Sequence, residues 1–245
     1  MNAAIYVIGD IHGQRTMLEE ALTRIEDDGG AGATVVFLGD LVDRGPDSRG
    51  VIDIILKGIA QGRDWIVLKG NHDDYVSRFL EQGDAHASKG HPELPWFNPK
   101  LGGDATLASY GVETEGRKIA DILEDACEAV PRAHRDFIAG LPLWHEADRL
   151  LFVHAGIRPG VPLAEQSAED LMWIREPFLS WPERHPWLVV HGHTALDFPH
   201  HYGNRVNLDG GAGWGRPLIP AVFEGRHCWL LTGDGRMRLP ANPGF

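Results

Sequence analysis

Three short segments of the sequence carry residue types that bind metal ions, and each follows directly on an apolar run. They are residues 9–13 (GDIHG), 39–45 (GDLVDRG) and 70–73 (GNHD). Each segment opens with glycine and then offers a carboxylate, an amide or an imidazole. Three neighbouring strand ends with such donors are what a site for two divalent cations needs. Two later segments, 153–156 (VHAG) and 191–194 (HGHT), offer further imidazoles.

The elements that must position these donors alternate between strand and helix. Apolar runs predict strands at residues 5–8, 34–38 and 65–68, and helical spacing of apolar residues predicts helices at residues 14–27 and 48–62. This alternation implies right-handed crossovers and a parallel sheet. The carboxyl ends of parallel strands meet at one edge, where α/β sheets bind ligands. We therefore expect the donor segments to collect at that edge.

The donor segments supply ligands for two ions. The six candidate ligands are Asp10, His12, Asp40, Asn71, His154 and His193. Asp10 and His12 share one loop and can bind the first ion, while the two oxygens of Asp40 can bridge both ions, as a closely spaced pair requires. Asn71 adds a neutral amide oxygen to the second ion. A water shared by two such ions has its pKa lowered toward neutrality, so the predicted nucleophile is a metal-bridging hydroxide.

Two arginines and one histidine complete the predicted chemistry. Arg44 and Arg175 can hold phosphate oxygens through planar, bidentate guanidinium groups. His72 follows the ligand Asn71 directly and can protonate a leaving oxygen, with Asp43 orienting its ring. We expect in-line attack on a phosphomonoester, with the cations neutralising the transition state.

The five segments resemble those of the calcineurin-like metallophosphoesterases and, within them, of the bacterial phosphoprotein phosphatase (PPP) family, over residues 5–215. This resemblance implies an α/β fold, a sandwich of two mixed β-sheets flanked by helices with the metals at one end. It implies a phosphomonoester hydrolase, with a serine/threonine protein phosphatase as the leading function and phosphotyrosine as a further substrate. The candidate ligands resemble the family's metal ligands, and Arg44 and Arg175 resemble its phosphate-binding arginines. The choice of His193 over His191 as a ligand also rests on this comparison.

Two other functions remain open. The symmetrical diadenosine tetraphosphate hydrolases share the metal segments and cleave a phosphoanhydride; an aspartate directly before Arg44 favours the phosphatases over them. A non-catalytic metal-binding scaffold is the third candidate, and it is disfavoured because every ligand, arginine and acid is present. Taken singly, Asp40 and Asp43 could instead be turn formers before the Gly-Pro that follows.

Charge and ligand chemistry restrict the cofactors and partners. Mixed carboxylate, amide and imidazole ligation suits Mn²⁺, with Fe²⁺ or Zn²⁺ as alternatives. A formal net charge of −12 argues against a nucleic-acid partner, because such proteins need a basic face. Two bound ions would invert the field in the cleft, so a phosphorylated protein, a peptide or a small nucleotide is the expected partner.

Length and composition predict one domain over residues 1–245. Residues 83–118 interrupt the alternation with prolines and glycines, and we interpret them as an insertion that forms either a surface excursion or a wall over the cleft. The second half is predicted to be mainly strands, with one helix at residues 167–173. The predicted strands are residues 150–153, 187–190, 205–208, 221–223 and 228–231.

The remaining signals concern the cellular setting. Cys127 and Cys228 lie in apolar stretches without metal spacing, so buried free thiols are expected. No apolar run approaches the length of a membrane span, and the first strand follows Met1 too closely for a signal peptide, so a soluble cytoplasmic protein is expected. Four histidines have no partner spacing and are predicted to be solvated: His145, His185, His200 and His201.

Overall fold

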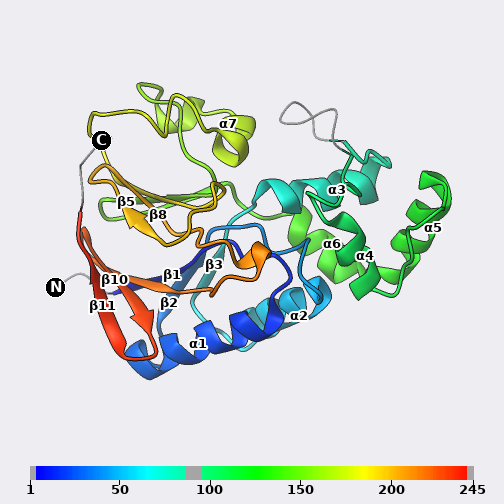
Figure 1. The fold of residues 1–245 in the computed structure, drawn as a ribbon, viewed down its shortest axis with the longest axis horizontal. Coiled ribbons are helices and arrows are strands. Elements are labelled where there is room, and N and C mark those ends of the chain that lie inside the picture. Colours follow the sequence, from blue (N-terminus) through cyan, green and yellow to red (C-terminus); the bar gives the residue numbers. More distant parts are fainter. Residues whose placement is uncertain (1–3, 87–94, 242–245) are drawn as a thin grey trace.

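Two β-sheets lie against each other at the centre of the molecule, with helices outside them (Figure 1). The structure is a computed structural model that describes residues 4–86 and 95–241. Side chains from both sheets meet between them, including Val7 and Val36 from the first sheet and Phe152 and Val190 from the second. The predicted α/β fold with two mixed sheets flanked by helices is confirmed.

The first sheet has six strands in the order β11-β10-β9-β1-β2-β3. The strands are β1 (Ile5–Ile8), β2 (Thr34–Phe37), β3 (Trp65–Val67), β9 (Ala221–Glu224), β10 (His227–Thr232) and β11 (Gly235–Leu239). Strands β1, β2 and β3 are parallel, and β9 pairs antiparallel with β1. The carboxyl ends of β1, β2 and β3 therefore share one edge, as the alternation of strand and helix predicted.

The second sheet has five strands in the order β4-β5-β6-β8-β7. The strands are β4 (Trp144–Ala147), β5 (Leu150–Val153), β6 (Leu188–His191), β7 (His200–His201) and β8 (Arg205–Asn207). Strands β5, β6 and β8 are parallel, while β4 and β7 run antiparallel to their neighbours. This sheet also directs three strand ends toward a common edge.

Each sheet has a helical layer on its outer face. Helices α1 (Arg15–Gly29) and α2 (Ser48–Ala60) pack on the first sheet, because alternate β1 residues such as Tyr6 and Ile8 face them. On the second sheet, α7 (Ala168–Trp173) packs with Leu171 against Val189. Two short 3₁₀ helices, η1 (Leu163–Glu165) and η2 (Ala212–Trp214), complete the connections.

The described residues between β3 and β4 form four helices, which project as a group at one end of the molecule (Figure 1). They are α3 (Asn71–Gln82), α4 (Gly103–Ser109), α5 (Ile119–Ala129) and α6 (Arg132–Ala139). The predicted insertion at 83–118 is thus the middle of a longer helical segment, and its residues 87–94 lie outside the described part. Gly83 ends α3 in a left-handed conformation, which explains why the sequence pattern changes there.

Several predictions about single elements need correction. The sequence pattern missed β4, β7 and β11, and it missed the four helices between β3 and β4. His185 and His201 are buried rather than solvated: the His185 ring stacks on Phe178, and His201 Nδ1 accepts a hydrogen bond from the Gly203 N–H.

Both cysteines are free thiols, although only Cys228 is fully buried. Burial raises the pKa of the Cys228 thiol to about 12, so this side chain behaves as an apolar core residue. Over the described ranges 4–86 and 95–241, no helix combines the length and apolar character that crossing a bilayer requires.

Candidate metal centre

The predicted donor segments do meet at one edge of the sandwich, where five strands end. Asp10 follows β1, Asp40 follows β2, and Asn71 begins α3 after β3; His154 and His193 follow β5 and β6. All five side chains follow the carboxyl ends of strands, which is the position where α/β sheets bind ligands.

The backbone around this edge is strained. Six non-glycine residues in the described ranges have positive φ angles, and five of them belong to the donor segments: His12, Asp40, Asp43, Arg44 and His193. Each such residue costs on the order of 1–3 kcal/mol, so the surrounding structure must hold it in place. Strain gathered at one edge is typical of a functional site.

Asp73 holds the strained loop after β2 against the start of α3. Its buried carboxylate accepts hydrogen bonds from the backbone N–H groups of Asp40 (2.9 Å), Leu41 (3.0 Å) and Gly70 (2.8 Å). The same carboxylate caps the amino end of α3, where negative charge is favoured. Sequence reasoning missed this role, although an acidic residue at the third position of a helix is a recognisable capping signal.

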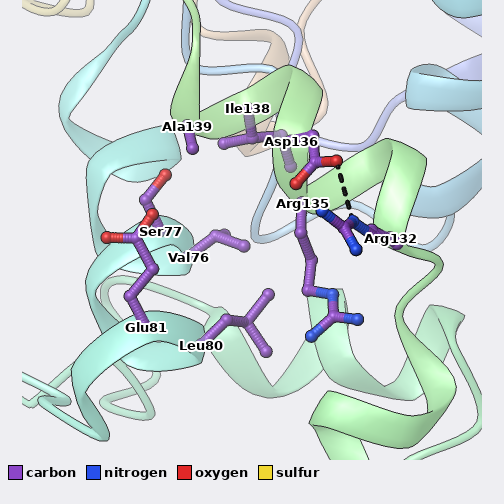
Figure 2. Close-up of a pocket in the computed structure, with 9 residues that line it drawn as sticks. All are labelled: Val76, Ser77, Leu80, Glu81, Arg132, Arg135, Asp136, Ile138 and Ala139. Carbon is purple, nitrogen blue, oxygen red and sulfur yellow. Dashed lines mark hydrogen bonds and ion pairs between the residues drawn. The ribbon is translucent and has the colours of Figure 1, made fainter.

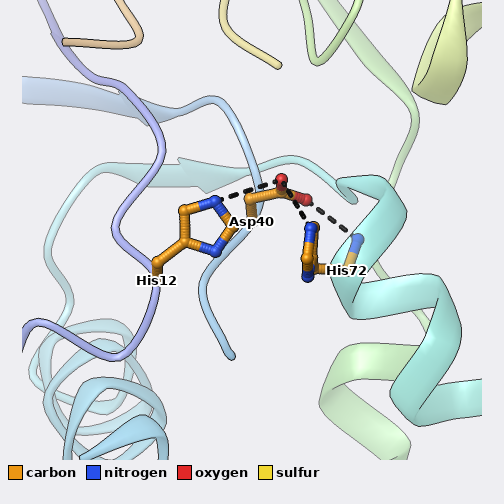
Figure 3. A group of neighbouring side chains, drawn as sticks. All are labelled: His12, Asp40 and His72. Atoms are coloured by element: carbon orange, nitrogen blue, oxygen red, sulfur yellow. Dashed lines mark hydrogen bonds and ion pairs between the residues drawn. The ribbon is translucent and has the colours of Figure 1, made fainter. Parts of the chain in front are cut away.

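Asp40 lies between two imidazoles in the first group of potential ligands (Figure 3). Its Oδ2 is 3.6 Å from His12 Nε2 and 4.0 Å from His72 Nε2. The His72 backbone N–H donates to Asp40 Oδ1 at 2.9 Å, which fixes the carboxylate against the start of α3. The group could hold one metal ion, and it includes His72, which the sequence assigned to proton transfer.

A second group shares Asp40 and lies toward the other sheet. Asp40 Oδ1 is 3.4 Å from His154 Nε2, and His193 completes the group. Asn71 Oδ1 lies 2.9 Å from His154 Nε2 and 2.8 Å from His193 Nδ1. The two groups thus have Asp40 in common, as the bridging role predicted for it requires.

Lone pairs face one another in this second group. His154 Nδ1 donates to the Leu38 carbonyl, since a carbonyl oxygen can only accept, and burial lowers the pKa of His154. The ring is therefore neutral, and its Nε2 presents a lone pair to the Asn71 amide oxygen, which is also an acceptor. Two acceptors this close are stabilised by a cation between them. His12 is arranged alike, because its Nδ1 donates to the Val42 carbonyl at 2.9 Å.

Among the six candidate ligand side chains, two buried atoms have no hydrogen-bond partner in the described structure: Asp10 Oδ1 and His193 Nε2. The other Asp10 oxygen accepts the His193 backbone N–H at 3.0 Å, so this carboxylate also belongs to the same cluster. Burial raises the pKa of Asp10, and the nearby charges of Asp209 and Asp40 raise it further. Buried carboxylates this close together need positive charge to stay ionised. The residues present therefore fit a pair of divalent cations.

Burial also lowers the pKa of His12 and of His193. The positive charge of Arg44 adds to this shift at His12, and that of Arg175 adds to it at His193. Neutral imidazoles are the form that binds metal, so these shifts prepare the rings for ligation near neutral pH.

The two predicted phosphate-binding arginines are placed differently. Arg44 lies inside the cluster, and its guanidinium donates to His12 Nε2 at 2.6 Å and to His72 Nε2 at 3.1 Å. Arg175 follows α7 and is exposed. Its charge reaches His193, whose pKa it helps to lower, so both arginines contribute positive potential to the same edge.

His72 and Asp43 form a buried pair, as predicted. His72 Nδ1 donates to Asp43 Oδ2 at 2.6 Å. Two residues of the predicted insertion hold the carboxylate: Trp96 Nε1 donates to Oδ2 at 2.9 Å, and Thr106 Oγ1 donates to Oδ1 at 2.6 Å. Sequence reasoning missed Trp96 and Thr106, because nothing in their spacing connects them to a residue more than fifty positions away. The insertion therefore contacts the site through Asp43.

Two further residues are not direct participants. His191 is buried, its Nδ1 lies 3.1 Å from the Gly192 carbonyl, and burial lowers its pKa to about 3. Arg216 donates to the Leu196 carbonyl at 3.1 Å and pairs with Asp197, so it closes a loop instead of entering the site.

A separate cavity of about 290 Å³ lies between α3 and α6 (Figure 2). Val76, Leu80 and Ile138 form its apolar lining, and the Arg135 side chain extends into it. None of the predicted site residues lines this cavity, although α3 begins at the candidate ligand Asn71. The cluster itself is therefore the site that the sequence motifs describe.

Known proteins resemble this chain in sequence and in fold. The chain is similar to the bis(5'-nucleosyl)-tetraphosphatase PrpE (asymmetrical) of Geobacillus thermodenitrificans strain NG80-2, with 28% identity over 241 residues, which cover 87% of this chain and 88% of that protein. A solved structure provisionally identified as a diadenosine tetraphosphatase has a TM-score of 0.63 and 21% identity, over 99% of this chain and 95% of that one. The cold-active protein-tyrosine phosphatase of a Shewanella species has a TM-score of 0.64 and 15% identity, over 98% and 81%.

These findings confirm the coarser prediction of a metallophosphoesterase and leave the finer prediction of a protein phosphatase without specific support. The protein is a hydrolase that acts on phosphoric esters. The narrower assignment to the PPP protein phosphatases is not supported specifically, because the sequence relatives are named for nucleotide hydrolysis and the solved structures show only a shared fold at these identities. Residues 3–214 match the calcineurin-like phosphoesterase family, and the chain belongs to that family.

Proposed function

We propose that the protein is a two-metal phosphohydrolase. Asp10 and His12 would hold one ion, Asn71, His154 and His193 the other, and Asp40 both. The observation that supports this most strongly is the sharing of Asp40 by two ligand groups. When bound, two divalent ions act as Lewis acids and lower the pKa of water enough to supply hydroxide near neutral pH. Mn²⁺ is the leading choice, with Fe²⁺ and Zn²⁺ as alternatives.

The remaining site residues handle the phosphate and the leaving group. Arg44 and Arg175 are proposed to hold phosphate oxygens, because both bring positive charge to the same edge as the ligands. In the structure Arg44 donates to His12 Nε2, which would bind metal, and to His72 Nε2, which would carry the transferred proton. We therefore expect its guanidinium to turn toward phosphate in the loaded enzyme. His72 would protonate the leaving oxygen, with its ring held by Asp43.

Two substrate classes follow from different observations. The relatives that match most of this chain are named asymmetrical dinucleoside tetraphosphatases, which favours a dinucleoside tetraphosphate cut unequally instead of the symmetrical cleavage considered from the sequence. The buried His72–Asp43 pair favours phosphomonoesters such as phosphoserine, because an alkoxide needs a proton to leave whereas a phosphate leaves without one. We place the dinucleotide first and the phosphoprotein second.

One experiment tests both the reaction and the substrate. Phosphate-ester hydrolysis by Mn²⁺-loaded protein is measured on diadenosine tetraphosphate and on phosphoserine, phosphothreonine and phosphotyrosine peptides, with Asp40→Asn as the blank. We expect metal-dependent turnover, highest in kcat/KM for the dinucleotide, with AMP and ATP as products. ADP as the single nucleotide product would mean symmetrical cleavage. Faster peptide turnover would make the protein a phosphoprotein phosphatase.

A non-catalytic scaffold remains the alternative from another class. Stoichiometric binding of two metal ions without turnover of any of these substrates would establish it. Full activity of Asp40→Asn would contradict the two-metal proposal itself, because no other carboxylate in the described residues belongs to both groups.

A further inference from the structure

Trp214 is a large aromatic side chain that stays open to solvent beside the metal cluster. It is 56% exposed, and the Arg44 guanidinium carbon lies 4.5 Å from the centre of its ring. Arg44 in turn donates to His12 and His72. The Trp214 ring therefore contacts Arg44, which is proposed to bind phosphate, and Arg44 links it to His72, which is proposed to transfer a proton.

The loop that carries Trp214 is built to hold one conformation. Gly211 and Gly215 flank η2 with φ angles of 82° and 80°, which side chains other than glycine rarely adopt. The Trp214 N–H donates to the Gly211 carbonyl at 2.9 Å, and the Gly211 N–H donates to Asp209 Oδ1 at 2.9 Å. These contacts restrict where the ring can point.

The same loop is pressed against the site from one side and anchored on the other. A Cβ atom at Gly213 would lie 2.6 Å from the His12 ring, so only glycine allows the loop this close. Arg216 anchors its far end through the Leu196 carbonyl and Asp197. The position of Trp214 is thus set by the backbone of its own loop, which packs against the His12 ring and is anchored through Arg216.

Packing does not explain why this tryptophan is exposed. Trp96 is fully buried against Asp43, and Trp173 packs its ring against Tyr75 and His193. Trp214 instead leaves most of its apolar surface in water, which is unfavourable unless a ligand covers it. A rigid, exposed aromatic ring beside a phosphate-binding arginine suits a substrate that carries a flat ring near its phosphate.

We infer that Trp214 is a specificity-determining residue that stacks on an aromatic ring of the substrate, in the first place a nucleobase. This inference rests on the proposed function, because it assumes that phosphate binds beside Arg44. It deepens that proposal by assigning recognition of the base to one side chain. A phosphotyrosine ring has the same stacking chemistry, and the test separates the two.

The test compares ligands that differ only in the ring. The dissociation constants of AMP and ribose 5-phosphate are measured by calorimetry on Mn²⁺-loaded protein, since the two ligands share the sugar phosphate and differ in the base. Turnover of phosphotyrosine and phosphoserine peptides of one sequence forms the second pair. The variants are Trp214→Ala and Trp214→Phe. The matched control is Trp144→Ala, because Trp144 on β4 is also exposed, at 40%.

We expect Trp214→Ala to weaken AMP binding by about ten- to a hundredfold while changing ribose 5-phosphate binding less than about twofold. Trp214→Phe should retain most of the affinity, and Trp144→Ala should change neither ligand. A loss confined to phosphotyrosine turnover would instead assign the ring to a tyrosine. Equal weakening of both members of each pair would reduce Trp214 to a support for Arg44 and overturn the inference, as would unchanged binding.

Failure of the inference and failure of the proposed function give different results. Base-dependent binding that disappears in Trp214→Ala, in a protein without turnover, would contradict the proposed function alone. Metal-dependent turnover with no difference between AMP and ribose 5-phosphate in any variant would contradict the inference alone.

Discussion

Asp43 Oδ2 lies 2.6 Å from His72 Nδ1, and both side chains are buried beside Asp40. Asp43 is held on its other sides by an indole and a hydroxyl from the segment between β3 and β4. The ring of His72 is thereby fixed so that its Nε2 lies 4.0 Å from Asp40 Oδ2 and 3.1 Å from the Arg44 guanidinium. A fixed ring in that position can serve as proton donor or as metal ligand, and the two roles predict different behaviour.

Replacement of His72 separates these roles. His72→Asn should lower kcat by roughly 10²–10⁴-fold on substrates with poor leaving groups, because an amide cannot donate a proton to the leaving oxygen. Metal content, measured by inductively coupled plasma mass spectrometry, should remain at two ions per chain. Loss of one ion would show that His72 ligates metal, as its place in the group with His12 and Asp40 allows.

Trp96 should matter for activity although it lies outside every donor segment. Trp96→Phe keeps the aromatic packing but removes the N–H that Asp43 accepts. We expect kcat to fall by roughly tenfold with metal content unchanged, since partners that orient a functional side chain typically have effects of this size. Trp65→Phe, on β3 against Phe37, is the control and should leave kcat unaltered. A wild-type kcat in Trp96→Phe would show that the hydrogen bond from Trp96 to Asp43 is not needed for catalysis.

Asp73 should contribute to stability more than its neighbour does. Asp73→Ala leaves three buried N–H groups without an acceptor and should lower the free energy of unfolding by about 3 kcal/mol. The measurement is urea denaturation of metal-free protein. Asp74→Ala, in the same first turn of α3, is the matched control and should cost less than about 1 kcal/mol. Equal losses would mean that helix capping alone accounts for the effect.

Stability of the metal-free protein should fall as the pH drops below about 6.5. Burial lowers the pKa of His191 from 6.5 to about 3, so between these values the unfolded chain binds a proton that the folded chain does not. Stability therefore rises with pH across this window and is lost on acidification, by about 1.4 kcal/mol per pH unit for one such group. Urea titrations at several pH values would measure the slope. His191→Gln should make it shallower, and an unchanged slope would exclude His191 as a contributor.

Metal binding should raise the thermal midpoint of unfolding. Ligands that bind only the folded state stabilise it by about 2.7 kcal/mol at a hundred times their dissociation constant. Titration of chelator-treated protein with Mn²⁺ in a thermal-shift experiment should therefore show a concentration-dependent rise. Asp40→Asn should abolish most of this rise, because Asp40 belongs to both ligand groups. A full response in that variant would contradict the shared ligand.

Local sequence determined the sheet edge and most of the donor set. Four-residue apolar runs such as Ile5–Ile8 and Leu150–Val153 are typical of strands that are buried on both faces. The residues that follow such strands, here Asp10 and His154, then lie at a common edge of the sheets. The metal ligands could be predicted because carboxylate, amide and imidazole groups that follow glycine at several strand ends are typical of a metal site. Family membership follows from the same segments.

The tertiary structure decided what surrounds those donors. Trp96 and Thr106 reach Asp43 across more than fifty residues, and Trp214 reaches Arg44 across more than one hundred and fifty; no periodicity in the chain encodes such contacts. The four helices described between β3 and β4 escaped prediction, and one of them, α4, lies among the prolines and glycines of residues 83–118 that were interpreted as an insertion. Sequence spacing specifies where a strand ends, whereas packing of distant segments specifies which side chains meet beyond that end.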